Sequence, residues 1–335
     1  MNFGYREVCL DHDTGERHPE SSDRLRAVRR ALTECHGVDY ITTDDADTDL
    51  VRSVHDPDYI EEFREYCADG GGHWDADTVA VEATWDAALA AAGAAVWAAE
   101  TAGVDVRARE TPFALGRPPG HHAVGDDAMG FCFINNAGVA AQAALDQGAD
   151  SVAIFDWDVH HGNGTQDIFY DRSDVFYASI HEDGLFPGTG EIDETGVGAG
   201  EGTTANVVYQ PGADTADYLG AIDEVIAPEI ADYNPDLLLV SAGFDAHEHD
   251  PISRMQVSTE GYGVMTERMI DLADDCDAGL GFVLEGGYGL ETLSDSITMV
   301  HEVFDGYQPV APDDDVSEAA REVLNEVETQ GLGSK

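Results

Sequence analysis

Basic side chains are scarce in this chain of 335 residues, which has 16 lysines and arginines against 68 aspartates and glutamates. Lys335 is its only lysine, and the formal net charge is −52. A chain this negative repels phosphate backbones, so we expect no direct binding to nucleic acid. The acidic residues are spread through the whole sequence, which argues against a disordered acidic arm. Repulsion among this many negative charges destabilises a compact state unless salt screens it. We therefore expect that the protein comes from a cell with a high-salt cytoplasm.

Long apolar runs, paired cysteines and linkers are also missing. No stretch reaches the roughly 18 apolar residues of a membrane helix, and the nearest, residues 87–99, is short, alanine-rich and typical of a packed helix. Residues 1–7 lack a basic segment followed by an apolar one, which predicts no secretion signal. The five cysteines form no C-x-x-C pair and indicate free thiols in a reducing cytoplasm. We expect one domain over residues 1–328 and a flexible tail at 329–335, and the sequence leaves homo-oligomerisation open.

Patterns typical of helices alternate with short apolar runs typical of buried strands. The expected helices are residues 22–34, 56–67, 79–100, 136–147, 214–231, 259–274 and 316–327. The expected strands are residues 151–157, 175–180, 237–241 and 281–284, and residues 184–202, with seven glycines, form a long functional loop. This alternation predicts a single-domain, three-layer α/β/α fold with a central parallel sheet. Ligands in such folds bind beyond the carboxyl ends of the strands.

The most informative segment is residues 154–164, an apolar run that ends in two acids, two imidazoles and glycine-rich chain. If the strand continues through it, Asp156, Asp158 and His160 share one face. Two buried carboxylates beside an imidazole need a cation among them. Catalytic zinc takes three protein ligands and keeps a position open for water. Asp158 and His160 supply two of the three, and Asp245, which follows another buried strand, is the best third candidate.

Two neighbours of this group receive other roles. Asp156 lies deeper in the strand, where we expect it to pair with an imidazole or to hold a structural monovalent cation, although a second metal stays open. Strand alternation would turn His161 away from Asp158 and His160, so we expect it to pack or to support a ligand.

A second group of residues is suited to proton transfer and charge stabilisation. His121 and His122 follow two prolines and a glycine, and fixed imidazoles suit proton transfer near neutral pH. The apolar run at residues 130–134 strengthens a functional interpretation of this pair. Tyr288 follows a strand end and two glycines, where its hydroxyl can meet a developing oxyanion.

Taken together, these motifs make the chain resemble the zinc-dependent histone deacetylase and acetylpolyamine amidohydrolase superfamily, which has an arginase-like fold, and in particular its class II members. The resemblance runs from residues 12–20 (HDTGERHPE) to residues 285–288 (EGGY), which is most of the chain. It implies one zinc ion, with Asp158, His160 and Asp245 as its ligands. It also implies His121 and His122 as the tandem histidines, with Asp156 and Asn163 as their respective partners.

The resemblance assigns further residues by position. Tyr288 would polarise the substrate carbonyl, and Arg24 would line an inner acetate channel. The residues of the acyl-lysine channel would be Gly130, Phe131, Phe186, Ile252 and Gly287. A structural potassium ion would be held by Asp156, Ser179 and the carbonyls of Asp158, His160 and Ile180, and a second one by the carbonyls of Phe169, Arg172 and Val175.

Three positions bear on mechanism and substrate. Asn163 stands where class I members have aspartate, and a neutral amide leaves His122 more readily neutral and able to act as a base. Tyr288 stands where class IIa members have histidine, which argues for a competent catalyst. Ile252 stands where polyamine-selective relatives have an acidic gatekeeper, which favours acetyl-lysine side chains of proteins as the substrate.

Three alternatives stay open. An acetylpolyamine amidohydrolase would use the same residues on a small acetylamine. A two-metal ureohydrolase is faintly suggested by His247 and Asp250 next to Asp245, but Tyr288 fits it poorly. A non-catalytic acyl-lysine-binding scaffold is opposed by the intact set of ligands, histidines and tyrosine.

Overall fold

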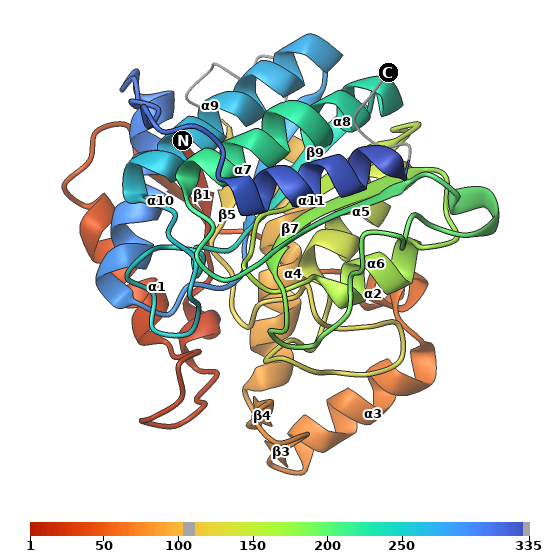
Figure 1. The fold of residues 1–335 in the computed structure, drawn as a ribbon. Coiled ribbons are helices and arrows are strands. Elements are labelled where there is room, and N and C mark those ends of the chain that lie inside the picture. The colour runs from red at the N-terminus through yellow and green to blue at the C-terminus, as the bar shows by residue number, and fades with distance from the viewer. Residues whose placement is uncertain (103–110, 331–335) are drawn as a thin grey trace.

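The computed structural model describes residues 1–102 and 111–330, and a sheet of eight strands forms its centre (Figure 1). The strands lie in the order β2-β1-β5-β10-β9-β6-β7-β8, and each neighbouring pair is parallel. Their bounds are β1 (Asn2–Gly4), β2 (Asp39–Ile41), β5 (Pro112–Ala114), β6 (Val152–Asp156), β7 (Val175–Glu182), β8 (Thr204–Tyr209), β9 (Leu237–Ala242) and β10 (Gly279–Leu284). A separate antiparallel pair joins β3 (Gly72–His73) to β4 (Val79–Ala80).

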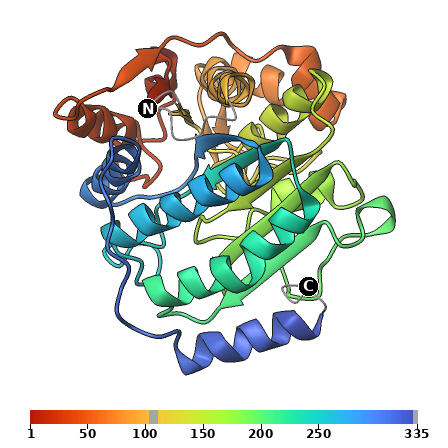
Figure 2. The same cartoon turned by 90° about the horizontal axis from the view of Figure 1, so that it is seen from above.

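Helices cover both faces of this sheet (Figures 1 and 2). The layer that packs on Phe155 and Val240 consists of α1 (Asp23–Leu32), α7 (Thr215–Ala221), α8 (Ala227–Tyr233), α9 (Thr259–Cys276), α10 (Leu290–Phe304) and α11 (Glu318–Thr329). The layer on the opposite face, against Ile154 and Leu239, consists of α4 (Thr84–Thr101), α5 (Asn136–Asp146) and α6 (Asn163–Phe169). Outside it, α2 (Thr48–Val54) packs on α5 and α3 (Pro57–Ala68) packs on α4. This arrangement confirms the predicted three-layer α/β/α fold.

The four predicted strands are the central strands of the sheet. Every residue of β6, β7, β9 and β10 is buried, because helices cover both faces. Strands that are covered on both faces have nearly continuous apolar sequences, which is the pattern observed here. They hold the ends of β6, β9 and β10 side by side at one edge of the sheet.

Some predicted boundaries are wrong. The helix expected at residues 79–100 begins only at Thr84, because Val79 and Ala80 pair with β3. The strand expected at residues 151–157 ends at Asp156. The helix expected at residues 214–231 contains a π-helical segment, Ile222–Ile226, between α7 and α8. The remaining predicted helices correspond to α1, α3, α5, α9 and α11 within a few residues.

Helix α4 is the alanine-rich segment and packs inside the protein, with Ala91, Ala95 and Ala98 fully or almost fully buried. Among the described residues, no helix is long and apolar enough to cross a membrane. All five cysteines are free thiols. Helix α11 includes Thr329, so the predicted tail begins too early, and its residues 331–335 lie outside the described residues.

Candidate metal centre and catalytic site

The candidate site lies where β6 and β9 end at the same edge of the sheet. The register pairs Asp156 at the end of β6 with Ser241 of β9, so the two following loops start side by side. Asp158 and His160 lie in the first loop and Asp245 in the second. The predicted strand alternation through His160 is therefore wrong, because these residues are brought together by loops. Their position beyond the carboxyl ends of parallel strands is the one expected for a ligand site.

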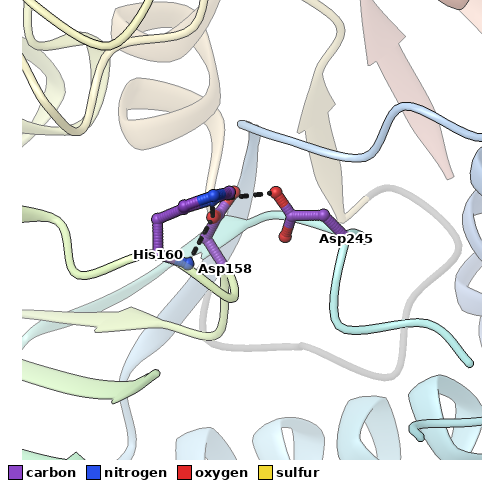
Figure 3. A group of neighbouring side chains, drawn as sticks. All are labelled: Asp158, His160 and Asp245. Atoms are coloured by element: carbon purple, nitrogen blue, oxygen red, sulfur yellow. Dashed lines mark hydrogen bonds and ion pairs between the residues drawn. The ribbon is translucent and has the colours of Figure 1, made fainter. Parts of the chain in front are cut away.

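The ligand atoms of Asp158, His160 and Asp245 lie within 4.8 Å of one another (Figure 3). The His160 Nδ1 atom is 3.0 Å from Asp158 Oδ1 and 3.2 Å from Asp245 Oδ2. Both carboxylates are fully buried, whereas the His160 side chain keeps 12% of its surface exposed. Within residues 1–102 and 111–330, no other group of three histidine, cysteine or acidic side chains converges in this way.

The buried carboxylates of Asp158 and Asp245 favour a positive charge between them. Burial disfavours a charged imidazole, but Asp158 and Asp245 outweigh it and raise the pKa of His160 to about 10. Asp245 Oδ2 is buried and accepts no hydrogen bond of good geometry, although such oxygens are normally satisfied. Two carboxylates and one imidazole are a donor set that suits zinc. The residues present therefore fit a divalent metal ion, which would replace the proton on His160.

Backbone groups orient both carboxylates. Val159 N donates to Asp245 Oδ1 at 2.9 Å, and Gly286 N donates to Asp158 Oδ2 at 2.8 Å. A side chain at Gly286 would collide with Asp245 Oδ2 and Asp158 Oδ2, so only glycine allows this approach. Hydrogen bonds of this kind fix the direction in which a ligand oxygen points.

The two tandem histidines lie next to this group with ring centroids 4.0 Å apart. His121 Nδ1 is 2.9 Å from Asp156 Oδ2, and His122 Nδ1 is 2.8 Å from Asn163 Oδ1. Burial lowers the pKa of His121, but Asp156 and Asp158 outweigh it and raise this pKa to about 10. Burial and then the charges of His121 and His160 hold the pKa of His122 well below 6.5. The pKa values of the two imidazoles are thus shifted in opposite directions.

Tyr288 lies in the loop after β10 and contacts both Arg24 and Phe131. The Arg24 Cζ atom is 5.0 Å from the centroid of the Tyr288 ring, and the Phe131 ring meets it edge-on at 5.9 Å. Burial raises the pKa of Tyr288 well above 10 and outweighs the opposing charge of Arg24. The phenol therefore stays protonated and can donate a hydrogen bond.

Two aromatic rings and a glycine border the histidines. Phe186 meets the His122 ring edge-on, with ring centroids 5.0 Å apart, and is 44% exposed. A side chain at Gly130 would collide with His122 and Phe186. Phe131 has a φ of 71°, a left-handed conformation that is costly for a bulky residue. Gly130 and Phe186 thus border His122, and Phe131, which follows Gly130 in the chain, contacts Tyr288.

The two predicted potassium sites differ in how their residues are used. Asp156 and Ser179 are register partners on β6 and β7, and Ser179 Oγ lies 3.0 Å from His181 Nδ1. At the second site, the Phe169 carbonyl accepts from Arg172 N at 3.0 Å, and the Arg172 carbonyl accepts from Thr203 Oγ1 at 3.0 Å. Two of the three carbonyls of the second group, those of Phe169 and Arg172, thus already have partners.

His161 and Ile252 lie outside the metal group. His161 Nδ1 is 2.8 Å from Thr189 Oγ1, and its Nε2 is 3.0 Å from Gln166 Oε1, so both ring nitrogens have partners. Ile252 is half-buried and its N–H donates to Asp250. The carbonyl of Gly287 accepts from Arg24 Nε at 2.7 Å.

Sequence reasoning missed two buried acids. Glu285 Oε2 accepts from Gly120 N at 2.7 Å and from His121 N at 3.1 Å, and burial raises the pKa of Glu285 to about 7. Glu20 binds Arg117 through both of its carboxylate oxygens, each at 2.7 Å, and also contacts Arg24. An acid directly before a glycine-rich loop was the available signal for Glu285, whereas the Glu20 contacts join segments far apart in the chain.

An α/β fold with a buried Asp-His-Asp group and paired histidines places the protein among candidate metallohydrolases. Similarity to known proteins identifies the family. The histone deacetylase domain family matches residues 18–304. A probable deacetylase of Archaeoglobus fulgidus is 38% identical over 86% of this chain and 81% of its own length. A histone deacetylase-like amidohydrolase of Pseudomonas aeruginosa is 39% identical over 85% of this chain and 81% of its own length.

A solved structure agrees with these relatives. The crystal structure of the HDA15 HD domain superposes with a TM-score of 0.88 at 35% identity, covering 98% of this chain and 94% of that one. The chain therefore belongs to the histone deacetylase family, within the superfamily that includes acetylpolyamine amidohydrolases. Membership identifies it as a hydrolase of the deacetylase and amidohydrolase kind.

Proposed function

We propose that this protein is a zinc-dependent deacetylase that removes acetyl groups from acetyl-lysine side chains of proteins. The observation that carries the proposal is the buried Asp-His-Asp group, whose ligand atoms lie within 4.8 Å of one another, next to His122, whose Nδ1 is 2.8 Å from Asn163 Oδ1. A neutral base next to a metal-binding group is the arrangement that metal-assisted amide hydrolysis requires.

Asp158, His160 and Asp245 would hold one zinc ion. When bound there, zinc would act as a Lewis acid on the acetyl carbonyl and lower the pKa of a water molecule toward ~7. The three residues contribute two negative charges and a neutral imidazole, so the loaded site is neutral overall. This charge neutrality supports a bound zinc ion in preference to a site in which His160 is only a protonated partner of the two carboxylates.

His122 would act as the general base. The Asn163 amide nitrogen faces the His122 carbonyl at 3.4 Å and Met129 Sδ at 3.3 Å, which leaves Asn163 Oδ1 to accept from His122 Nδ1–H. The proton would thus be on Nδ1, and Nε2 would keep a free lone pair for the proton of the attacking water. His121, charged and paired with Asp156, would stabilise negative charge as the amide is attacked, and either histidine can protonate the leaving amine.

Tyr288 would donate its hydroxyl hydrogen to the developing oxyanion, because its pKa stays far above neutrality. Phe131 and Phe186, together with Gly130, Gly287 and Ile252, would line the channel for the acetylated side chain. Narrow apolar walls exclude water from the reacting amide and hold the linear chain in place.

We also propose a structural potassium ion at Asp156, Ser179 and the Ile180 carbonyl. The buried Asp156 carboxylate beside the Ser179 register position supports a monovalent cation there. The second potassium site, at Phe169, Arg172 and Val175, has weaker support because two of its carbonyls are engaged. A salt-rich cytoplasm would supply the ion.

The test is hydrolysis by the purified zinc-loaded protein of an acetyl-lysine peptide and of acetylspermidine, compared at equal concentration. We expect faster turnover of the peptide, because Ile252 offers no charge to a polyamine. Tyr288→Phe should lose about 10²- to 10³-fold in kcat and keep its zinc, whereas Tyr307→Phe, at an exposed tyrosine, should behave as the wild type. Faster turnover of acetylspermidine would favour the polyamine alternative, and no turnover of either would leave an acyl-lysine-binding scaffold.

A further inference from the structure

The loop that carries Tyr288 poses a problem of rigidity. Tyr288 lies among three glycines, Gly286, Gly287 and Gly289, which leave the backbone conformationally free in the unfolded chain. A group that stabilises an oxyanion must instead be held at its position before the charge develops. Some part of the surrounding protein must therefore fix this loop.

The first half of the loop is fixed from the metal side and from α1. Gly286 N donates to Asp158 Oδ2 at 2.8 Å. Arg24 donates to the carbonyl of Glu285 at 2.5 Å and to the carbonyl of Gly287 at 2.7 Å. These contacts end at Gly287, whose φ of 112° turns the chain just before Tyr288.

The second half is fixed by Asp250. Its Oδ2 atom accepts from Tyr288 N at 2.7 Å and from Gly289 N at 3.0 Å. Two consecutive N–H groups that converge on one carboxylate oxygen form an anion-binding concavity. Asp250 is only 7% exposed, and its own N–H donates to the His247 carbonyl at 2.8 Å, so the carboxylate is anchored.

The other oxygen of this carboxylate reaches a second functional position. Asp250 Oδ1 accepts from Ile252 N at 3.1 Å. The carboxylate therefore joins the loop of Tyr288 to the turn that carries Ile252. The turn precedes α9 in the chain and the loop follows it. Charge-assisted hydrogen bonds are about twice as strong as neutral ones, which suits a clamp of this kind.

We infer that Asp250 is a positioning residue for Tyr288, holding the tyrosine in register with the Ile252 turn. The inference rests on the proposed deacetylase function and assigns Asp250 no contact with substrate. Asparagine has one acceptor oxygen where aspartate has two, so Asp250→Asn cannot serve both segments at once. Its amide nitrogen would face backbone donors on one side.

The test is a double-mutant cycle with Tyr288→Phe, read on the acetyl-lysine peptide. Displacement of a catalytic group by about 1 Å costs up to about 10²-fold, so Asp250→Asn alone should lower kcat by about 10- to 100-fold, with little change in zinc content. In the Tyr288→Phe background the same change should cost almost nothing, since no hydroxyl is left to position. Asp223→Asn, at the surface partner of Arg268, is the matched control and should leave kcat unchanged.

Equal losses in the two backgrounds, or no loss in the wild type, would overturn the role of Asp250. Amide hydrogen exchange over residues 285–289 gives a readout that does not depend on turnover, and it should accelerate in Asp250→Asn. If that variant fails to fold, Asp250→Glu keeps the charge, displaces both oxygens and should show the same non-additivity. A wild type inactive on every acetylated substrate would refute the proposed function, and the role of Asp250 with it.

Discussion

At the scale of single residues, the surroundings of two adjacent histidines shift their pKa values in opposite directions. His121 faces a carboxylate and His122 faces the amide of Asn163, at nearly the same distance. The pKa of His121 is raised to about 10, and that of His122 is held well below 6.5. Burial and the charges of His121 and His160 lower the pKa of His122, and in the proposed mechanism a neutral amide at residue 163 leaves this shift in place.

Asn163→Asp should move the acid limb of the pH–rate profile to higher pH. A carboxylate beside His122 raises its pKa, so the ring stays protonated at pH values where the wild-type ring is a free base. The measurement is kcat/KM of the acetyl-lysine peptide between pH 5 and 9, with the exposed Gln147→Glu as the control for added charge. Superimposable profiles for Asn163→Asp and the wild type would remove His122 from the role of base.

Phe131, which we propose as a wall of the channel, offers a test of backbone strain. Its left-handed backbone costs a non-glycine residue roughly 1–2 kcal/mol, so Phe131→Gly should be more stable than Phe131→Ala by about 1 kcal/mol. Both variants should raise KM, because both lose the ring. Chemical denaturation measures the difference, and the same pair at Phe133, whose φ is not positive, should show the opposite order. An alanine variant more stable than the glycine variant at residue 131 would contradict the strain.

At the scale of elements, the buried Glu20 joins α1 to the loop after β5. It lies between Arg117 and Arg24, all three side chains being fully buried. Burial raises the pKa of Glu20, but Arg117 outweighs it and lowers this pKa to about 2. A depressed carboxyl pKa stabilises the fold above the unfolded value of about 4.5, and this contribution is lost as the pH falls toward 2.

Glu20→Gln should therefore destabilise the protein by about 3–5 kcal/mol at neutral pH, the usual cost of leaving buried charges unpaired. Denaturant unfolding at several pH values gives the measurement. The difference from the wild type should be constant above pH 4.5 and shrink below it. Equal stabilities at pH 7 would show that the two arginines find other partners.

The same scale shows which features the sequence can predict. The central strands, such as Val152–Asp156 and Leu237–Ala242, are recognisable because both of their faces are apolar. Three-residue strands such as Asn2–Gly4 are too short to carry a pattern and are defined only by their partners. The three candidate metal-binding residues could be identified from their residue types alone. Their arrangement could not, because the strand ends before Asp158 and loops, not the alternation of side chains along a strand, bring them together. The clamp by Asp250 could not be predicted, since it is made to backbone N–H groups.

At the scale of the whole molecule, the excess of acidic residues is the main electrostatic influence on stability. Arginines form pairs such as Arg268–Asp223 and Arg321–Glu224, but the 16 lysines and arginines against 68 acidic residues leave a formal net charge of −52. Repulsion among the remaining carboxylates opposes the compact state, and at molar salt the screening length shrinks to ~3 Å.

The melting temperature should therefore rise steeply from low to molar KCl and then level off. Differential scanning calorimetry at fixed pH measures it, with an uncharged osmolyte at equal osmolality as the control. The osmolyte should reproduce only a small part of the rise. A melting temperature that does not change with KCl would contradict the expectation of a high-salt protein.

The central claim is that Asp158, His160 and Asp245 hold one catalytic divalent ion. The most direct measurement is the zinc content of the purified protein, by mass spectrometry of the metal, together with turnover of the acetyl-lysine peptide. We predict one zinc per chain in the wild type and in Tyr288→Phe, and loss of both zinc and turnover in Asp245→Ala and after chelation. Full zinc content and full turnover in Asp245→Ala would contradict the account.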